Sequence, residues 1–399
     1  MLIKVFYNRI SVYLPDTNIG VCLMKNEMWD RLNRIRISGF KSICEMELEL
    51  KNLTVLIGAN GAGKSNFVSF FRLLNYMTSN SLPSYIAEKG GANSLLHFGI
   101  KTTTSLGCTL YFETQAGKNV YNMNMAKGAG DTLFFTNEEV AFSRSGSIND
   151  APLVSLGGGH SDTKMNSKDL NPLSKIGTTA KTIRNIMNQW RFYQFHDTSD
   201  TARIKQQTLL TDCNYLRADA GNIAAFLYML KYKYLEYYDR IVSTVRQIAP
   251  FFCDFVLEPT YDKKSILLQW KDINSDMVFN ADQLSDGTIR TIALVTLLLQ
   301  PNLPSLVCVD EPELGLHPYA IGVLSSLLKK ASTISQIIVS TQSVSLINQM
   351  DIEDLVVVDK IAGKSTFKRL IPGDFEQWLN DYSLGDLWES NLIGGRPSR

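Results

Sequence analysis

The first regular pattern along the chain is an alternation of apolar and polar residues from Arg34 to Leu50, which is typical of a β-strand. Residues 53–57 then form an apolar run that predicts a buried strand, and a glycine-rich turn follows it. Apolar residues next recur at helical spacing, at Phe67, Phe70, Phe71 and Leu74. The beginning of the ordered chain is therefore predicted to be strand, turn and helix.

The middle of the chain has a different character. Residues 75–181 are rich in Gly, Ser, Thr and Asn and contain short alternating stretches, which predict hairpins and partly mobile loops, including a surface loop at 155–167. A helix is predicted at 181–190 and a strand at 191–199. A long helical region from about 209 to 250 and one strand at 265–272 follow.

The last third alternates buried strands with helices. A buried helix is predicted within 283–300, and a strand at 354–360 is expected to close the sheet. Strands that alternate with helices indicate an α/β fold with a mainly parallel core sheet. The predicted segments are an N-terminal extension (1–32), the first part of the core (33–75), a loop- and hairpin-rich insertion (76–185), a strand with a helical subdomain (186–280) and the second part of the core (281–399).

Composition excludes several classes of protein. The chain has 399 residues, 45% hydrophobic and 20% charged, and a formal net charge of +1, so no global charge favours nucleic acid or an acidic partner. Its six cysteines include no CxxC pair, which disfavours a zinc site or a redox dithiol and suits a reducing cytoplasm. The longest apolar runs are too short to span a bilayer, and the N-terminus lacks a signal-peptide core, so a cytoplasmic protein without a membrane partner is predicted.

Residues 58–65, GANGAGKS, fit the pattern GxxxxGK[ST] between a predicted strand and a predicted helix. In such a loop, backbone N–H groups and the helix N-terminus bind phosphate oxygens. Lys64 reaches the β- and γ-phosphates of ATP and the Ser65 hydroxyl binds Mg²⁺. The predicted nucleotide-binding residues of this loop are Asn60, Gly61, Ala62, Gly63, Lys64, Ser65 and Asn66.

An apolar strand that ends in two carboxylates, LVCVDE at 306–311, points to a metal and a general base. Burying carboxylates is costly unless they meet a cation or hydrogen-bond donors. Asp310 is predicted to hold Mg²⁺, and Glu311 to polarise the attacking water. The alternative is that these acids only cap the next helix.

The string LSDGT at 284–288 is a weak signal alone, because Ser-Asp-Gly is also an ordinary turn and helix start. Its position between the P-loop and the Asp-Glu strand, at the start of a buried helix, favours the signature motif of ABC-type ATPases. Ser285 and Gly287 are its candidate nucleotide-binding residues.

Five motifs in this order, IRISGFKSI, GANGAGKS, LSDGT, VDEPELGLHP and STQS, resemble the SMC/RecF/OLD branch of ABC ATPases. The chain resembles more closely the compact bacterial predicted AAA ATPases of that branch, through YQFHDTS and the tail WLNDYSLGDLWESNLIGGRP as well. The resemblance covers about residues 33–396 and is weakest at 75–181. It implies an ABC-type P-loop ATPase head with a mainly parallel core sheet, an antiparallel β part and a helical insertion.

The resemblance also implies a head-to-tail dimer with two ATP molecules between the protomers. Lys64 and Ser65 of one copy would then face Ser285 and Gly287 of the other. Each site would lack half of its phosphate contacts without the second copy, so hydrolysis is expected to depend on dimerisation.

Other positions carry over from the family pattern with an alternative beside each. Gln194 matches a lid glutamine that senses Mg²⁺ and the γ-phosphate, or it is a half-exposed strand residue; His196 and Asp197 lie beside it. Lys41 and Ser42 in GFKSI lie near the nucleotide, or form a solvated turn.

The sequence departs from the family at Gln342, where a histidine is usual. Glutamine donates a hydrogen bond but does not change charge near neutral pH, so a catalytic Gln342 predicts slow hydrolysis rather than a dead site. His317 is predicted to be structural in the loop after the Asp-Glu strand, with a role across the dimer interface as the alternative.

Two functions remain at this point. The compact subgroup resembles ATPase components of bacterial anti-phage systems, which implies a sensor or scaffold that works with a separate effector, a nuclease or toxin. The alternative is a RecF-like DNA repair or maintenance ATPase, for which the basic segment between Lys164 and Lys205 is either a DNA-binding face or simply solvated. A transporter subunit fits the IRISGFKSI and EPELGLHP motifs less well.

Overall fold

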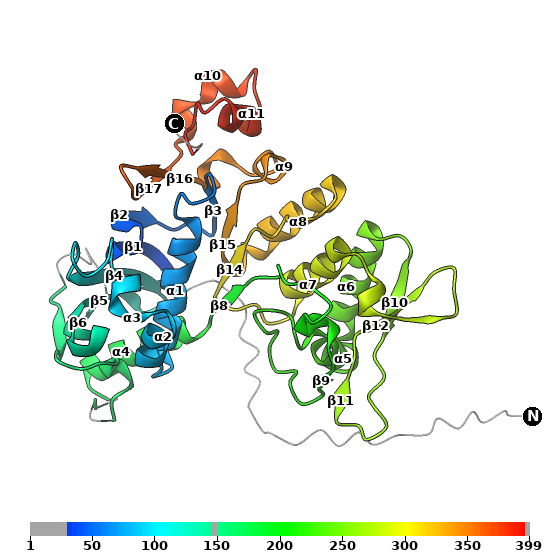
Figure 1. The fold of residues 1–399 in the computed structure, drawn as a ribbon, viewed down its shortest axis with the longest axis horizontal. Coiled ribbons are helices and arrows are strands. Elements are labelled where there is room, and N and C mark those ends of the chain that lie inside the picture. Colours follow the sequence, from blue (N-terminus) through cyan, green and yellow to red (C-terminus); the bar gives the residue numbers. More distant parts are fainter. Residues whose placement is uncertain (1–29, 145–150, 169, 172, 396–399) are drawn as a thin grey trace, which may run out of the picture.

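The computed structural model describes residues 30–144, 151–168, 170, 171 and 173–395. The predicted N-terminal extension lies almost entirely outside these residues. Figure 1 shows a part built on two sheets, with α1 and α4, and a more helical part that contains α5, α6 and α7. Within the described residues, no helix is both long enough and apolar enough to cross a membrane.

The first sheet is antiparallel and starts with a hairpin. The predicted strand 34–50 is two strands that turn at Lys41, whose φ is 48°. The hairpins predicted between 76 and 185 are confirmed, and they extend this same sheet through pairing of β4 with β1. Its strands, in spatial order, are β2 (Ile43–Glu49), β1 (Arg31–Phe40), β4 (Ser105–Thr114), β5 (Gly117–Lys127), β6 (Leu133–Ser143) and β7 (Val154–Gly157).

The second sheet is the mainly parallel core that the sequence predicts. Its strands, in spatial order, are β17 (Lys364–Arg369), β16 (Leu355–Ile361), β3 (Leu53–Ile57), β15 (Gln336–Thr341), β14 (Leu306–Asp310) and β8 (Trp190–Tyr193). The prediction that 354–360 closes the sheet is wrong, because β17 lies outside it and runs antiparallel. Ala362 and Gly363 have φ values of 49° and 80°, so they form the tight two-residue turn that returns the chain.

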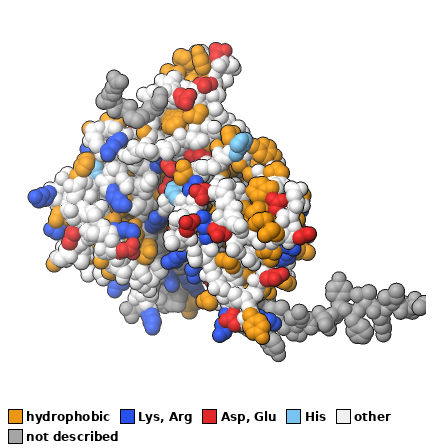
Figure 2. Space-filling model, turned by 45° about the vertical axis from the view of Figure 1, so that its right-hand side comes forward, with side chains coloured by type: hydrophobic (Ala, Val, Ile, Leu, Met, Phe, Trp, Pro, Cys, Tyr) orange, Lys and Arg blue, Asp and Glu red, His pale blue; other side chains and the backbone are white. Residues whose placement is uncertain are grey.

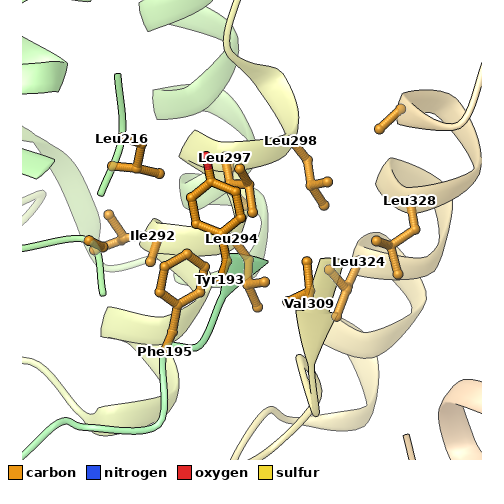
Figure 3. Close-up of a cluster of buried hydrophobic side chains, with 14 of the residues drawn as sticks. Tyr193, Phe195, Leu216, Ile292, Leu294, Leu297, Leu298, Val309, Leu324 and Leu328 are labelled. Carbon is orange, nitrogen blue, oxygen red and sulfur yellow. The ribbon is translucent and has the colours of Figure 1, made fainter. Parts of the chain in front are cut away.

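Helices cover both faces of the core sheet. One hydrophobic core lies between the two sheets and includes α1 (Lys64–Thr78) and α4 (Lys175–Asn188). The other core packs the opposite face against α7 (Asp286–Leu299) and α8 (Pro318–Ala331). Figure 3 shows this second core, with Tyr193 and Val309 of the sheet among Leu294, Leu297 and Leu298 of α7 and Leu324 of α8. Burial on both faces explains why the core strands read as continuous apolar runs.

The long helix region predicted at 209–250 is partly wrong. Only α5 (Ile223–Lys233) and α6 (Leu235–Ile248) are helical, and the chain breaks between them at Tyr234. Before α5, the fully buried Asn222 donates to the carbonyls of Asp212 and Tyr215 and accepts from the Arg217 N–H. This side chain holds residues 212–222 as a loop, because it satisfies backbone groups that a helix would otherwise pair.

The strand predicted at 265–272 is split between two small sheets. β11 (Ser265–Ile266) pairs with β9 (Thr208–Leu209), whereas β12 (Gln269–Asp272) lies between β10 (Phe252–Val256) and β13 (Val278–Asn280). The remaining helices are short: α2 (Leu82–Glu88), α3 (Gly91–Leu95), α9 (Val344–Ile347), α10 (Glu376–Leu379) and α11 (Leu384–Glu389).

Candidate functional site

Strand register brings most of the predicted site residues to one edge of the core sheet. The aligned pairs at the carboxyl ends of neighbouring strands are Tyr193 with Val309, Asp310 with Ser340, and Thr341 with Ile57. Gln194, Glu311, Gln342 and Gly58 each follow directly after these ends. Ligands of open α/β sheets bind at this edge, so the register places the candidate site where the fold expects one.

Two glycines give the P-loop its shape. Gly61 and Gly63 have φ values of 80° and 122°, which L-residues with a Cβ rarely adopt, and Gly63 is the residue before α1. A Cβ on Gly63 would lie 2.0 Å from the Oγ of Ser365, whereas one on Gly61 would meet nothing within 4 Å. The loop is therefore pressed against β17 at Gly63 and open at Gly61.

This difference predicts unequal effects of two alanine substitutions. Gly63→Ala is expected to lower the free energy of unfolding by about 2–4 kcal/mol, because backbone strain and a clash with Ser365 add together. Gly61→Ala has the strain alone and is expected to cost about 1–2 kcal/mol. Urea unfolding of the two variants measures both values, and equal losses would contradict the packing of Gly63 against Ser365.

The Lys64 ammonium group is buried inside the loop. It donates to the carbonyl oxygens of Gly58 at 2.5 Å and Ala59 at 3.2 Å, and the residue is only 5% exposed. Burial lowers the pKa of Lys64, while the nearby Glu311, Asp310 and Glu313 carboxylates act in the opposite direction. These electrostatic influences place the loop lysine close to the carboxylates after β14.

Two hydroxyl groups support the P-loop, one from the turn between β1 and β2 and one from β17. Ser42 Oγ accepts from Asn66 Nδ2 and from Ser365 Oγ, both at 2.7 Å. Ser365 Oγ is also 2.5 Å from the Ala62 carbonyl oxygen. Lys41 points elsewhere, since its Nζ donates to Ser69 Oγ on α1 at 2.7 Å. Of the GFKSI turn, the structure places Ser42 at the P-loop and Lys41 along the side of α1.

The carboxylates after β14 differ in their surroundings. Asp310 is buried and accepts a hydrogen bond from the Ser340 hydroxyl. Glu311 is half-buried, has a φ of 44°, and its N–H donates to the Ser340 carbonyl at 2.8 Å. A positive φ in a non-glycine residue is a strained conformation that often marks a functional position.

Glu313 is a site residue that sequence reasoning missed. It is buried, it accepts from the Thr341 hydroxyl, and burial raises the pKa of its carboxyl group. Glu313 therefore fastens the loop after β14 to the end of β15, next to Gln342. The signal in the sequence that could have identified Glu313 is its position two residues after Glu311, in the same acidic run.

Gln194 lies at the end of β8 with its side chain already engaged. Its Oε1 accepts from Arg72 Nη2 of α1 at 3.1 Å, and its Nε2 lies 3.2 Å from His196 Nδ1. The other ring nitrogen of His196 lies 3.0 Å from the Asp310 carbonyl oxygen. Arg72 and His196 thus fix Gln194 beside the carboxylate strand. Arg72 was not identified from the sequence, where it reads as an ordinary helix residue.

The LSDGT segment lies in the helical part of the molecule. Ser285 is exposed at the start of α7, and its hydroxyl accepts from the Thr288 N–H at 3.2 Å. A Cβ on Gly287 would lie 2.5 Å from the Gly315 carbonyl, so this helix start is packed on the loop after β14. Arg290 strengthens the contact, because its guanidinium donates to the carbonyls of Phe195, His196 and Leu314.

Arg290 was also missed from the sequence, although it joins three candidate elements. It connects the signature helix to the segment after β8 and to the loop after β14. His317 of that loop caps α8, its Nδ1 accepting from the Tyr319 N–H at 3.2 Å. This placement is the structural role predicted for His317.

The donors at the sheet edge suit Mg²⁺, which prefers oxygen ligands. Ser65 supplies a hydroxyl group and Gln194 supplies an amide oxygen. Asp310 supplies a carboxylate that interacts electrostatically with Lys64. Within the described ranges, no group of three His, Cys, Asp or Glu side chains is placed to hold a metal ion. A bound Mg²⁺ would therefore depend on Ser65 and on phosphate oxygens as well as on Asp310.

Comparisons with known proteins agree with this geometry. A family model described as "AAA domain" matches residues 34–240, and one described as "AAA domain, putative AbiEii toxin, Type IV TA system" matches residues 167–348. A search of curated proteins found no match.

Two solved structures share the fold at low sequence identity. One is an SMC head bound to the C-winged helix domain of ScpA, with a TM-score of 0.57 and 15% identity over 87% of this chain and 99% of that one. The other is the Smc head domain with an extended coiled coil bound to the C-terminal domain of ScpA from Pyrococcus furiosus, with a TM-score of 0.56 and 14% identity over 88% and 99%.

The fold is that of these SMC head structures, and the edge of its core sheet carries a P-loop motif. Because one family model covers just over half of the sequence, the chain belongs to the AAA-domain family. The predicted fold class is confirmed by the SMC-head architecture.

Proposed function

We propose that this chain is a Mg²⁺-dependent ATPase whose nucleotide sites form between two copies arranged head to tail. The observation that carries the proposal is the separation of the two halves of a site. Lys64, Asp310 and Glu311 meet at the sheet edge, whereas Ser285 is exposed on the helical part. Within the described residues, the hydrogen bonds of the Ser285 side chain go only to Thr288. A second copy supplies the partner that an exposed signature serine needs.

In the proposed site, each group of residues has a separate role in binding phosphate, holding Mg²⁺ or activating water. Backbone N–H groups from Asn60 to Asn66 and the α1 N-terminus bind phosphate oxygens, and Lys64 leaves the Gly58 and Ala59 carbonyls to reach them. Ser65, Asp310 and Gln194 would hold Mg²⁺, which supplies positive charge at the phosphates. Glu311 polarises the attacking water. Ser285 and Gly287 of the second copy complete the site.

Gln342 makes slow turnover the expected behaviour. It follows β15 directly, next to Thr341, whose hydroxyl donates to the Glu313 carboxylate. Its side-chain amide can donate to a γ-phosphate, but it cannot become cationic as a histidine can. ATP binding is therefore retained while stabilisation of the developing charge is weaker.

The surface beside the signature motif suits a contact between copies. Leu314 and Tyr319 are exposed apolar residues in and just after the loop that packs on the start of α7, and Arg290 bonds to the Leu314 carbonyl. Figure 2 shows hydrophobic side chains gathered over the helical part of this face, with acidic and basic side chains near the middle. Exposed apolar area that adjoins a functional motif is typical of an interface.

Two inactive variants test the shared site by complementation. Lys64→Ala removes the P-loop lysine, and Ser285→Arg blocks the signature without touching the P-loop. Each alone is expected to hydrolyse no ATP. In an equal mixture, random pairing leaves about a quarter of the sites with both halves intact, so a corresponding share of the wild-type rate returns.

Phosphate release measures this rate, and Ser326→Arg on the exposed face of α8 is the control for a new surface arginine. If Ser285→Arg turned over ATP at the wild-type rate, the shared site would be wrong. A mixture that stays inactive although both variants fold and bind to each other would have the same meaning.

For the cellular role, we propose a sensor or scaffold ATPase of a bacterial anti-phage system that acts with a separate nuclease or toxin. The support is the resemblance to compact defence ATPases and the toxin-system description of the family model over residues 167–348. Co-purification with the products of its own operon tests the partner. A chain that purifies alone and still protects cells would contradict it.

The alternative role is RecF-like DNA maintenance, with DNA as the partner. It requires ATP-dependent duplex binding that weakens steeply with salt. Filter binding across a salt series, with charge reversals at Lys181 and Arg184 of α4, separates the two roles. Salt-sensitive duplex binding that the reversals abolish would favour DNA.

A further inference from the structure

The C-terminal tail, residues 371–395, ends against the P-loop. Figure 1 shows α10 and α11 at the top of the view, above β16 and α9. The Gly395 carbonyl accepts a hydrogen bond from the Ala59 N–H at 2.7 Å. The Gly395 N–H in turn donates to Asp359 Oδ1 of β16 at 2.9 Å. One residue of the tail thus joins the sheet to the second residue of the P-loop.

The contact is close enough to require glycine. Gly394 and Gly395 have φ values of 83° and 87°. A Cβ on Gly395 would come within 3.4 Å of Gly58 Cα, 3.2 Å of Val357 Cγ1 and 3.0 Å of Trp388 Nε1. The tail backbone therefore packs directly on the start of the P-loop, where a side chain would separate them.

The rest of the tail is anchored in the core. Leu387, Trp388 and Ile393 are buried in the cluster that covers the outer face of the core sheet. The Gly385 N–H donates to Asn348 Oδ1 at 2.6 Å, just after α9, and α9 begins two residues after Gln342. The tail consequently touches both the beginning of the P-loop and the segment that follows Gln342.

We propose that the chain Asp359–Gly395–Ala59 is a positioning element of the nucleotide site, an inference that rests on the ATPase function proposed above. The Lys64 ammonium group donates hydrogen bonds to the carbonyl oxygens of Gly58 and Ala59. When the Lys64 ammonium group moves to bind phosphate, it releases those carbonyl oxygens. The hydrogen bond from the Ala59 N–H to the Gly395 carbonyl then still holds Ala59 in place. The tail thereby preserves the shape in which the following N–H groups bind phosphate.

Two substitutions break this element at different points. Gly395→Ala separates the tail from Gly58, and Asp359→Ala removes the acceptor of the Gly395 N–H. Each is expected to raise the Kd and KM for ATP about tenfold, with a smaller change in kcat. Asp359→Asn keeps an acceptor oxygen and is expected to retain most of the affinity. Gly373→Ala, a tail glycine with nothing within 4 Å of its Cβ position, is the matched control.

Calorimetric ATP binding measures Kd, phosphate release measures KM and kcat, and thermal unfolding checks the fold.

A purely structural tail would lower the active fraction and kcat while Kd and KM stayed constant, which would overturn the proposal. Equal affinities for Asp359→Ala and Asp359→Asn would also overturn it. If Gly395→Ala fails to fold, the Asp359 pair decides. If the wild-type chain binds no ATP, the proposed function itself is contradicted. If Lys64→Ala is inactive but the tail variants bind ATP as the wild type does, only the role of the tail is contradicted.

Discussion

The Lys64→Ala variant is expected to lose ATP binding while it keeps its fold. The ammonium group makes two contacts to loop carbonyls that a phosphate would replace with charge-assisted hydrogen bonds. Two such bonds are worth about 3–6 kcal/mol, so the Kd for ATP should rise at least about a hundredfold. Isothermal titration calorimetry with ATP and Mg²⁺ measures the change.

The fold should survive because burial already acts against the Lys64 charge. The lowered pKa of Lys64 shows that desolvation outweighs the attraction of the nearby carboxylates. Removing the amine therefore takes away an unfavourable buried charge together with its bonds, and the thermal unfolding temperature should change little. Lys330→Ala, an exposed lysine near the end of α8, is the control for loss of one positive charge. Unchanged ATP affinity in Lys64→Ala would contradict the P-loop assignment.

Local patterns predicted the parts of the molecule whose structure depends on neighbours in sequence. The P-loop, α1, β14 and the start of α7 were all predicted, since glycine turns, apolar runs and helical spacing are local signals. Parallel pairing then determined which of these parts meet. It aligned Asp310 with Ser340 and Thr341 with Ile57, and so placed the P-loop and the carboxylates together.

The missed features depend on long-range contacts. Asn222 keeps residues 212–222, the first part of the predicted long helix, as a loop by bonding to three of its backbone groups, and no periodicity reveals this. Arg290 sits in a buried helix where only the structure shows that it bonds to Phe195, His196 and Leu314. Gly395 lies 336 positions after Ala59, so its contact with the P-loop has no local signal.

Within one copy, contacts of Arg290, His196 and Gly287 join the start of α7 to the segments that carry Asp310 and Glu311. Arg290 holds the start of α7 to the segment after β8, and His196 of that segment lies against the Asp310 carbonyl. Gly287 packs on Gly315, in the loop that begins with Glu311. In the dimer proposed above, a second copy that engaged Ser285 would therefore contact an element already attached to Asp310 and Glu311. Through this linkage, the proposed dimerisation would control turnover.

The Glu311→Gln variant is expected to bind ATP, to stop hydrolysing it and to accumulate as an oligomer. Glutamine has the same shape as glutamate, and the Glu311 N–H bond to the Ser340 carbonyl does not involve the side chain, so the loop geometry should persist. The substitution removes the carboxylate that we propose as the general base, so the rate of hydrolysis should fall about 10²- to 10⁴-fold. ATP that is bound but not cleaved would keep the two copies together, because it contacts both.

Size-exclusion chromatography with ATP and Mg²⁺ should show a larger species for Glu311→Gln that ADP does not produce, and phosphate release should confirm the lost turnover. Glu313→Gln is the comparison in the same loop. Burial already raises the pKa of the Glu313 carboxyl group, and Thr341 can still donate to an amide oxygen there, so its turnover should fall far less. Equal losses in the two variants would show that the loop tolerates no neutral side chain and would remove the distinction between Glu311 as base and Glu313 as support. Normal turnover in Glu311→Gln would place the base elsewhere at this edge of the sheet.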